Sequence, residues 1–175
     1  MAVGAKGMPR FAGRQHHQNS SLREKIVEHL LVGEILRELW RRGVTDTEIL
    51  RSEYDGFGYD LVLSRSELVR HIQLKSSKGP KPKKVGIATS LETRPSGCVL
   101  VTCVDDHLNL GPFYWFGNEP GVPLVLPEKL PVLRRTTRNK EGVRPDRLNY
   151  RELPPRYFLR LDDIQDVIVR LMGPI

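Results

Sequence analysis

A seven-residue run near the middle of the chain, Cys98–Val104, is apolar at every position except Thr102. A strand that is apolar on both faces is typical of a sheet that is covered on both sides. About twenty residues separate this run from an earlier strand-like segment that ends near Lys75, which leaves room for a crossover through a helix. The run therefore predicts a buried strand parallel to its neighbour, in an α/β fold with a mixed central sheet flanked by helices.

The earlier segment has the pattern of a β-hairpin. Its two arms, residues 58–63 and 69–75, are rich in apolar and β-branched residues and are separated by a short polar break. If the turn is centred near Ser66, Asp60 falls opposite Gln73 on the neighbouring arm, with Cβ atoms about 5 Å apart. The hairpin therefore predicts that a carboxylate and an amide meet on one face of the sheet.

Lys75 lies two residues beyond Gln73, so the alternation of a strand directs both side chains to the same face. A carboxylate, an amide and an ammonium group that converge are poorly suited to a hydrophobic core. Oxygen ligands beside a cation suit a metal ion and a phosphate group, so Asp60, Gln73 and Lys75 are the candidate site.

A helix with clear end signals is predicted before the hairpin, over Leu22–Arg42. Ser21 fits its N-cap, Glu24 has the capping-box spacing, and Gly43 fits the residue just past its end. We therefore interpret Glu24 as part of the helix cap.

The middle of this helix is apolar on nearly all sides apart from Glu34. A carboxylate in such surroundings must be paired or must bind a cation. An ion pair with Arg37 or Arg41 is the alternative to a metal-binding role.

Three parts of the chain are expected: a disordered tail over 1–20, a core over 21–130, and a basic extension over 131–175 that ends in a helix. In the first half of the chain the remaining elements are expected to be a strand at Glu48–Tyr54 and weak helical structure at Val85–Arg94. A strand at Phe113–Phe116 could form an edge, and residues 117–155 are expected to have little regular structure beyond Val122–Leu126. Tyr157–Leu161 could be a short strand, and a helix capped by Asp162 is expected over Asp163–Met172.

The formal net charge of +7 is concentrated in clusters. Residues 75–84 contain five lysines and no acid, and residues 134–151 contain seven basic and two acidic side chains. Such clusters indicate a polyanionic partner, although solvated basic loops are the simpler alternative. The candidate nucleic-acid-binding residues are Lys78, Lys81, Lys83, Lys84, Arg134, Arg135, Arg138 and Arg144.

No apolar run is long enough to span a membrane, and we expect no membrane partner. Cys98 and Cys103 lie at an odd spacing on one predicted strand, so they should point to opposite faces and remain unpaired. Reduced core cysteines favour a cytoplasmic location.

The predicted order is helix, three strands, helix, strand, with Glu34 on the first helix, Asp60 on the second strand and Gln73-Leu74-Lys75 on the third. This pattern resembles the PD-(D/E)XK, or restriction-endonuclease-like, superfamily, whose core is αβββαβ. The resemblance covers about residues 21–104. It implies that Asp60 and Gln73 hold Mg²⁺, with Mn²⁺ as a substitute, and that Glu34 joins them directly or through water. It also implies that Lys75 orients the attacking water or stabilises charge on the phosphate.

Gln73 departs from the family pattern, which usually has an acidic residue at this position. An amide oxygen can bind a metal but contributes no charge. The leading hypothesis is a metal-dependent endonuclease that hydrolyses phosphodiester bonds in DNA. The alternatives are a non-catalytic nucleic-acid-binding protein on the same scaffold and an interaction module with a basic surface. DNA is favoured over RNA, and a homodimer or a larger protein assembly stays open.

Overall fold

The computed structural model describes residues 19–54 and 56–175. The tail expected over 1–20 lies outside these residues except for its last two positions, and the first of the helices described begins at Ser20. Within the described residues, no helix is long and apolar enough to cross a membrane.

The core is a mixed six-stranded sheet with the order β1-β2-β3-β5-β6-β9. β3 and β5 pair in parallel, and the other neighbours pair antiparallel. This confirms the predicted α/β class and the parallel central strand. The strands are β1 (Glu48–Arg51), β2 (Leu61–Arg65), β3 (Leu68–Lys78), β5 (Cys98–Val104), β6 (Leu110–Gly117) and β9 (Leu159–Leu161).

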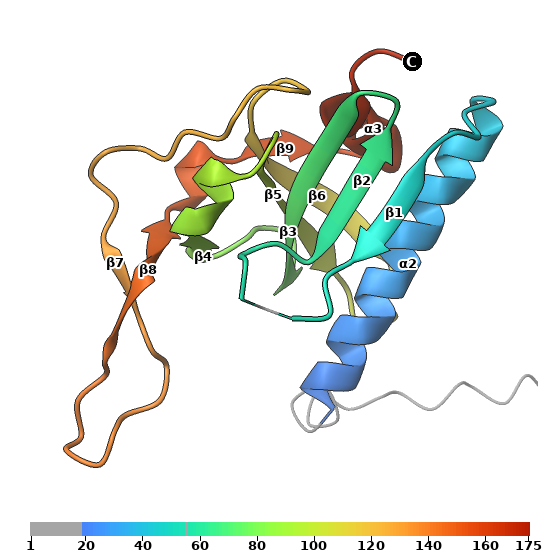
Figure 1. The fold of residues 1–175 in the computed structure, drawn as a ribbon. Helices are drawn as coiled ribbons and strands as arrows, with labels where there is room; N and C mark the ends of the chain where they lie inside the picture. The colour runs from blue at the N-terminus through green and yellow to red at the C-terminus, as the bar shows by residue number, and fades with distance from the viewer. Residues whose placement is uncertain (1–18, 55) are drawn as a thin grey trace, which may run out of the picture.

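Helices cover one face of this sheet, as Figure 1 shows. α2 (Ser20–Arg41) and α3 (Ile164–Met172) pack there against side chains such as Leu63 and Ile72. Cys98 belongs to this helical side of the core, whereas Cys103 belongs to the core on the other face. Both cysteines are unpaired, as predicted. Burial raises the pKa of the Cys98 thiol to about 12, so this thiol is unreactive near neutral pH.

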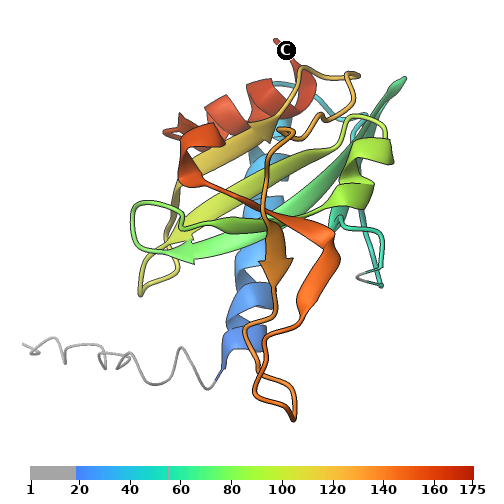
Figure 2. The same cartoon turned by 90° about the vertical axis from the view of Figure 1, so that its left-hand side faces the viewer.

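A second, three-stranded sheet with the order β4-β8-β7 lies on the opposite face. Figure 2 shows this layer in front of the main sheet, with α2 behind. The crossover from β3 to β5 passes through β4 and then through a short 3-10 helix, so the helix expected over Val85–Arg94 is replaced by a strand and about one turn. The new elements are β4 (Val85–Ala88), η1 (Thr89–Thr93), β7 (Val132–Arg134) and β8 (Asp146–Leu153).

Three expectations for the second half of the chain are wrong. β6 lies between β5 and β9, so it is an interior strand rather than an edge. No strand forms at Val122–Leu126, while β7 and β8 form in a region where no strand was expected. The C-terminal helix begins at Ile164, and Asp163 rather than Asp162 caps it, because the Asp163 carboxylate accepts hydrogen bonds from the N–H groups of Gln165 and Asp166.

The start of α2 also differs from the expected one. Asn19 is the N-cap residue, and its side chain makes no capping hydrogen bond. Ser21 therefore lies inside the first turn, and the capping box predicted for Ser21 and Glu24 does not form. Glu24 instead lines a cavity beside Asp60.

Candidate active site

A cavity of about 420 Å³ lies between the first turns of α2 and the strand end of β3. Its walls combine three carboxylates with two lysines and several hydroxyl and apolar groups. The lining residues are Ser21, Glu24, Lys25, Val27, Glu28, Leu31, Asp60, Leu74, Lys75, Ser76 and Thr102. Asp60 and Lys75, two residues of the predicted site, therefore share one cavity.

Asp60 is held by the backbone of both neighbouring strands. The pairing of Leu61 with Ile72 sets the register of the hairpin, and the Asp60 N–H donates to the Ile72 carbonyl at 2.9 Å. One carboxylate oxygen, Oδ2, accepts a hydrogen bond from the Leu74 N–H at 2.6 Å. β3 continues beyond Ile72, the partner of the first residue of β2. The Leu74 N–H therefore has no partner on β2, and Asp60 accepts its hydrogen bond instead. Its carboxylate is consequently fixed at the edge of the sheet.

The turn before Asp60 is fixed against the second layer. Gly58 has φ +81°, and a Cβ atom at this position would lie 2.4 Å from the Ala88 Cβ and 2.7 Å from the Ser90 Oγ. The Ser90 hydroxyl also donates to the Phe57 carbonyl at 2.9 Å. Only glycine fits such a close approach in the left-handed region. This contact sets where the chain enters β2 and hence where Asp60 lies.

Lys75 lines a second cavity as well as this one. The second cavity, of about 300 Å³, lies on the other side of Lys75 and Ser76 and is lined by Lys78, Lys83 and Lys84. In the described chain Lys75 forms no ion pair, although three carboxylates share its cavity. Its ammonium group is thus available to an anionic ligand that reaches either cavity.

Gln73 directly follows Ile72, the last residue of β3 that pairs with β2, and it is not among the residues that line the cavity. Its side chain is only 2% exposed, and its Oε1 accepts a hydrogen bond from the Ala88 N–H at 3.4 Å. The amide therefore ties β3 to β4. The geometry gives no support to Gln73 as a metal ligand, since its oxygen is directed to the backbone of β4.

Glu34 does not join Asp60, which corrects the prediction for the helix carboxylate. It lies in a shallow hollow on the outer side of α2, beside Leu30 and Gly33, and forms an ion pair with Arg37. Leu30 is 40% exposed, so the side of the helix that carries Glu34 faces solvent, while Leu31 and Ile35 on the other side are buried. The ion-pair alternative for Glu34 is the one that the structure shows.

Two helix carboxylates, those of Glu24 and Glu28, line the cavity in place of Glu34. Glu24 lies seven residues before Leu31, on the buried side of α2, where the helix extends beyond the packed part of the sheet. Within the described residues Glu24 forms no ion pair, whereas Glu28 is paired with Lys25 at 3.2 Å and with Arg51 at 3.5 Å. The periodicity of the helix contains this signal, but the capping-box interpretation concealed it.

The lysines after β3 follow the surface from the cavity toward the second layer. Lys78, Lys81, Lys83 and Lys84 are all exposed. Lys78 is paired with Asp106 at 3.0 Å, and Lys84 is paired with Glu152 at 2.7 Å. These are surface pairs, and a polyanion can compete for such lysines because exposed pairs are weak.

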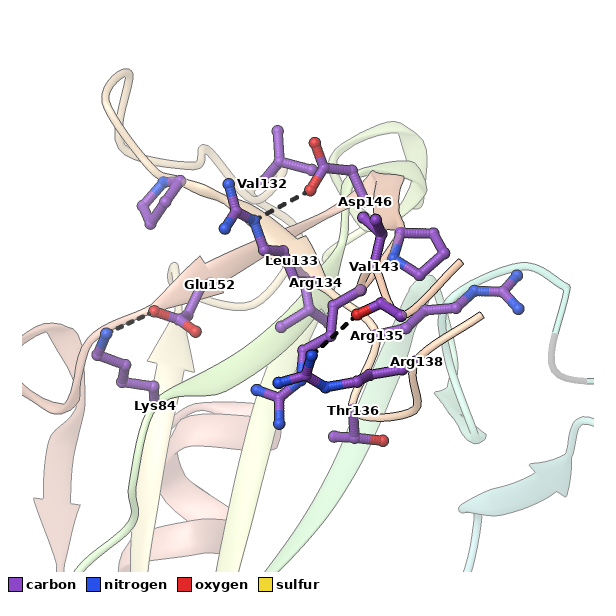
Figure 3. A pocket seen from close by; sticks show the side chains of 14 residues that line it. Lys84, Val132, Leu133, Arg134, Arg135, Thr136, Arg138, Val143, Asp146 and Glu152 are labelled. Atoms are coloured by element: carbon purple, nitrogen blue, oxygen red, sulfur yellow. Dashed lines mark hydrogen bonds and ion pairs between the residues drawn. The ribbon is translucent and has the colours of Figure 1, made fainter. Parts of the chain in front are cut away.

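A third, larger hollow of about 1170 Å³ continues this basic surface along β7 and β8. Lys84 lines both this hollow and the second cavity. Figure 3 shows the side chains of Arg134, Arg135 and Arg138 around it. Successive hollows share the lining residues Lys75 and Lys84. Seven of the predicted nucleic-acid-binding residues line them: Lys78, Lys83, Lys84, Arg134, Arg135, Arg138 and Arg144. Of that predicted set, Lys81 alone lines none of the three.

The donor set of the first cavity limits how it could hold a metal ion. In the described part of the chain, no group of three or more His, Cys, Asp or Glu side chains is placed to hold one. Two carboxylates, those of Asp60 and Glu24, fit a cation such as Mg²⁺, which commonly binds one or two protein carboxylates together with water and substrate phosphate.

Comparisons with known proteins give little further information. No protein-family model matches the sequence, and no curated protein sequence matches it either. Among solved structures, a bacterial homing endonuclease matches with a TM-score of 0.34 and 19% sequence identity, over 71% of this chain and 85% of that chain.

Proposed function

We propose that the protein is a metal-dependent endonuclease that hydrolyses phosphodiester bonds in DNA at the cavity between α2 and β3. The observation that supports this most is the composition of one cavity. Asp60 and Glu24 supply hard oxygen ligands there, and Lys75 supplies a cation. Lys75 also lines a second, lysine-rich cavity, which shares Lys84 with the basic hollow along β7 and β8, and these basic side chains would bind the phosphate backbone.

Asp60 and Glu24 would hold Mg²⁺, or Mn²⁺ in its place, and a phosphate oxygen of the substrate would complete the set. When bound, the ion would lower the pKa of a water molecule and offset the charge that develops on the phosphate. Asp60 is suited to this role because its hydrogen bond from the Leu74 N–H fixes the carboxylate before any ligand arrives.

Lys75 would place its ammonium group against the scissile phosphate. A fixed cation that faces the developing negative charge stabilises the transition state more than the ground state. The lysines of the second cavity would bind phosphates on either side of the scissile bond and so hold the strand in position. In this proposal Gln73 has a positioning role, since it ties β3 to β4 beside Asp60.

A non-catalytic nucleic-acid-binding protein on the same scaffold is the second candidate. The observation that favours it is the burial of Gln73. In the superfamily that the sequence resembles, an acidic ligand usually occupies this position, and here an amide faces away from the cavity. Both candidates predict salt-dependent binding to DNA. The two candidates differ only in whether the protein cleaves the bound DNA when a divalent ion is present.

The test compares the wild type with Asp60→Ala and Asp60→Asn on supercoiled plasmid DNA, with Mg²⁺ or Mn²⁺. We expect the wild type to nick or linearise the plasmid, and both variants to lose cleavage while they still bind DNA without metal. Asp60→Asn keeps an acceptor for the Leu74 N–H, so its folding should be intact. Asp46→Ala removes an exposed carboxylate that pairs with Arg65 and serves as the control with full activity.

Cleavage that survives in both Asp60 variants would remove this cavity from the mechanism. DNA binding by the wild type without any cleavage under either metal would establish the non-catalytic candidate. Failure to bind nucleic acid at low salt would exclude both candidates.

A further inference from the structure

The β7–β8 ribbon and its tip, residues 131–151, form an arm that extends away from the rest of the molecule in both views (Figures 1 and 2). Its base is attached to the body because β8 pairs with β4 from Leu153 back to Tyr150. Every residue from Arg134 to Arg144 is exposed. The outer part of the arm therefore contributes little to the core, and core packing does not account for its extended shape.

Hydrogen bonds order the arm along its length. The Arg135 N–H donates to the Pro145 carbonyl at 2.9 Å, one step beyond the last pair of β7 and β8. The tip is closed by Asn139, whose N–H donates to the Val143 carbonyl at 2.8 Å and whose Oδ1 accepts from the Val143 N–H at 2.8 Å. The inner part of the arm is thus the β7–β8 ribbon, and its outer part, residues 135–145, is a loop that these hydrogen bonds hold closed with a defined turn.

The arm carries seven basic and two acidic residues between 134 and 151. Within the described chain, Arg134 is paired with Asp146 at 3.3 Å, and no ion pair involves the basic residues nearest the tip. Arg138 donates one N–H to the Gly142 carbonyl at 3.0 Å and keeps other donors of its guanidinium group. The basic residues nearest the tip are Arg135, Arg138, Lys140 and Arg144.

We propose that this arm inserts into the major groove of B-form duplex DNA and that the substrate of the cavity is therefore a duplex. The major groove is about 12 Å wide and 8.5 Å deep, and it admits a two-stranded β-ribbon. Six fully extended residues span at most about 20 Å, so the loop from Arg134 to Lys140 is long enough to enter a groove of this depth. Arginine is also the side chain that most often reads guanine edges there.

The sequence of the arm argues against the other nucleic-acid shapes. Proteins that bind single strands use aromatic side chains on which bases stack, and residues 131–149 contain none. Tyr150 follows at the base, where the Arg147 guanidinium lies 3.7 Å from the centre of its ring. Duplex RNA has a deep and narrow major groove that a ribbon cannot enter.

The position of the arm relative to the cavity agrees with one continuous duplex. Lys84 lines the hollow along the arm and also the lysine-lined cavity, and Lys75 joins that cavity to Asp60. A duplex that receives the arm in one groove would present an adjacent backbone to the lysines. This part of the inference rests on the proposed function, because it places the arm and the cavity on the same DNA.

Binding of the full chain in metal-free buffer with a chelator tests the arm separately from catalysis. Fluorescence anisotropy would compare a mixed-sequence DNA duplex of about 30 base pairs, its single strand, the matching RNA duplex, and a DNA duplex whose pyrimidines carry bulky C5 substituents that fill the major groove. The arm variant is Arg138→Ala with Arg144→Ala. The control is Arg37→Ala with Arg41→Ala, which removes the same charge from the exposed side of α2.

We expect the wild type to bind the plain DNA duplex at least about tenfold more tightly than the other three probes. The arm variant should lose about tenfold on the plain duplex and should no longer distinguish the substituted one, while the control should stay within about threefold of the wild type. Equal binding of the plain and substituted duplexes, tighter binding of single strands, or equal losses in the two double variants would overturn the proposal. Duplex binding through the arm without Mg²⁺-dependent cleavage would keep the arm and reject the endonuclease, so the two failures are distinguishable.

Discussion

Arg70 is the largest side chain that the described fold buries completely, and it is a cation. Its Nε donates to the Leu171 carbonyl at 2.8 Å, and its Nη1 donates to the Asn118 carbonyl at 3.3 Å. The guanidinium group also lies 5.1 Å from the centre of the Trp115 ring. Burial lowers the pKa of Arg70, which reflects the cost of holding a charge there. This single residue ties β3 to the end of α3 and to the loop after β6.

Arg70→Met should lower the free energy of unfolding by about 3 kcal/mol or more, because it leaves several buried carbonyl groups without a donor. Arg70→Lys should also be strongly destabilising, since an ammonium group cannot reproduce the planar fork. Urea denaturation followed by circular dichroism measures both changes. Arg65→Ala, in the same hairpin, removes only an exposed pair with Asp46 and should cost less than about 1 kcal/mol. Equal losses of unfolding free energy at positions 70 and 65 would show that the buried hydrogen bonds of Arg70 do not stabilise the fold.

At the scale of elements, the sequence predicted the hairpin better than it predicted anything after it. The β2–β3 register follows from the two-residue turn between Arg65 and Leu68, close to the turn position that the sequence predicted near Ser66. β7 and β8 were missed because both strands are short or polar and lie outside the core, so they have no hydrophobic alternation to detect. The start of α2 was misplaced because Asn19 and Ser21 are both good capping residues.

Two glycines test how the elements fix the site. Gly58→Ala should lower the free energy of unfolding by about 2 kcal/mol or more and slow cleavage, because the added methyl group meets Ala88 and the backbone has a positive φ. Gly33→Ala should raise it by about 1 kcal/mol and leave cleavage unchanged, because a Cβ there meets no atom within 4 Å and alanine is the better helix former. Thermal unfolding and plasmid cleavage measure both variants. If Gly58→Ala changed neither stability nor the cleavage rate, the turn at Gly58 would not position Asp60.

At the scale of the whole molecule, the proposed site forms only when α2 docks onto the sheet. The proximity of Asp60 and Lys75 was predictable because one hairpin contains both, whereas strand alternation wrongly placed Gln73 with them, since its side chain faces β4. Glu24 was not predictable in the same way, because its place depends on which side of α2 is buried and on how far the helix extends beyond the sheet. The broad apolar surface of the helix made Glu34 look buried when it is not.

The three hollows that share Lys75 and Lys84 come together only in the folded chain. The sequence places the lysines of 75–84 and the basic residues of 134–151 far apart, and only the pairing of β4 with β8 brings Lys84 to the base of the arm. The charge clusters predicted a polyanionic partner, but their order along one surface required the fold.

The rate of Mg²⁺-dependent plasmid cleavage by Glu24→Gln and Glu34→Gln, measured under single-turnover conditions, tests the proposed site most directly. Both substitutions remove one carboxylate charge from the same helix with almost no change in shape. We predict that Glu24→Gln slows cleavage about 100-fold or more, since a ligand of the ion is worth several kcal/mol, and that Glu34→Gln stays within about threefold of the wild type. Equal rates for the two variants, or a larger loss at Glu34, would contradict the account.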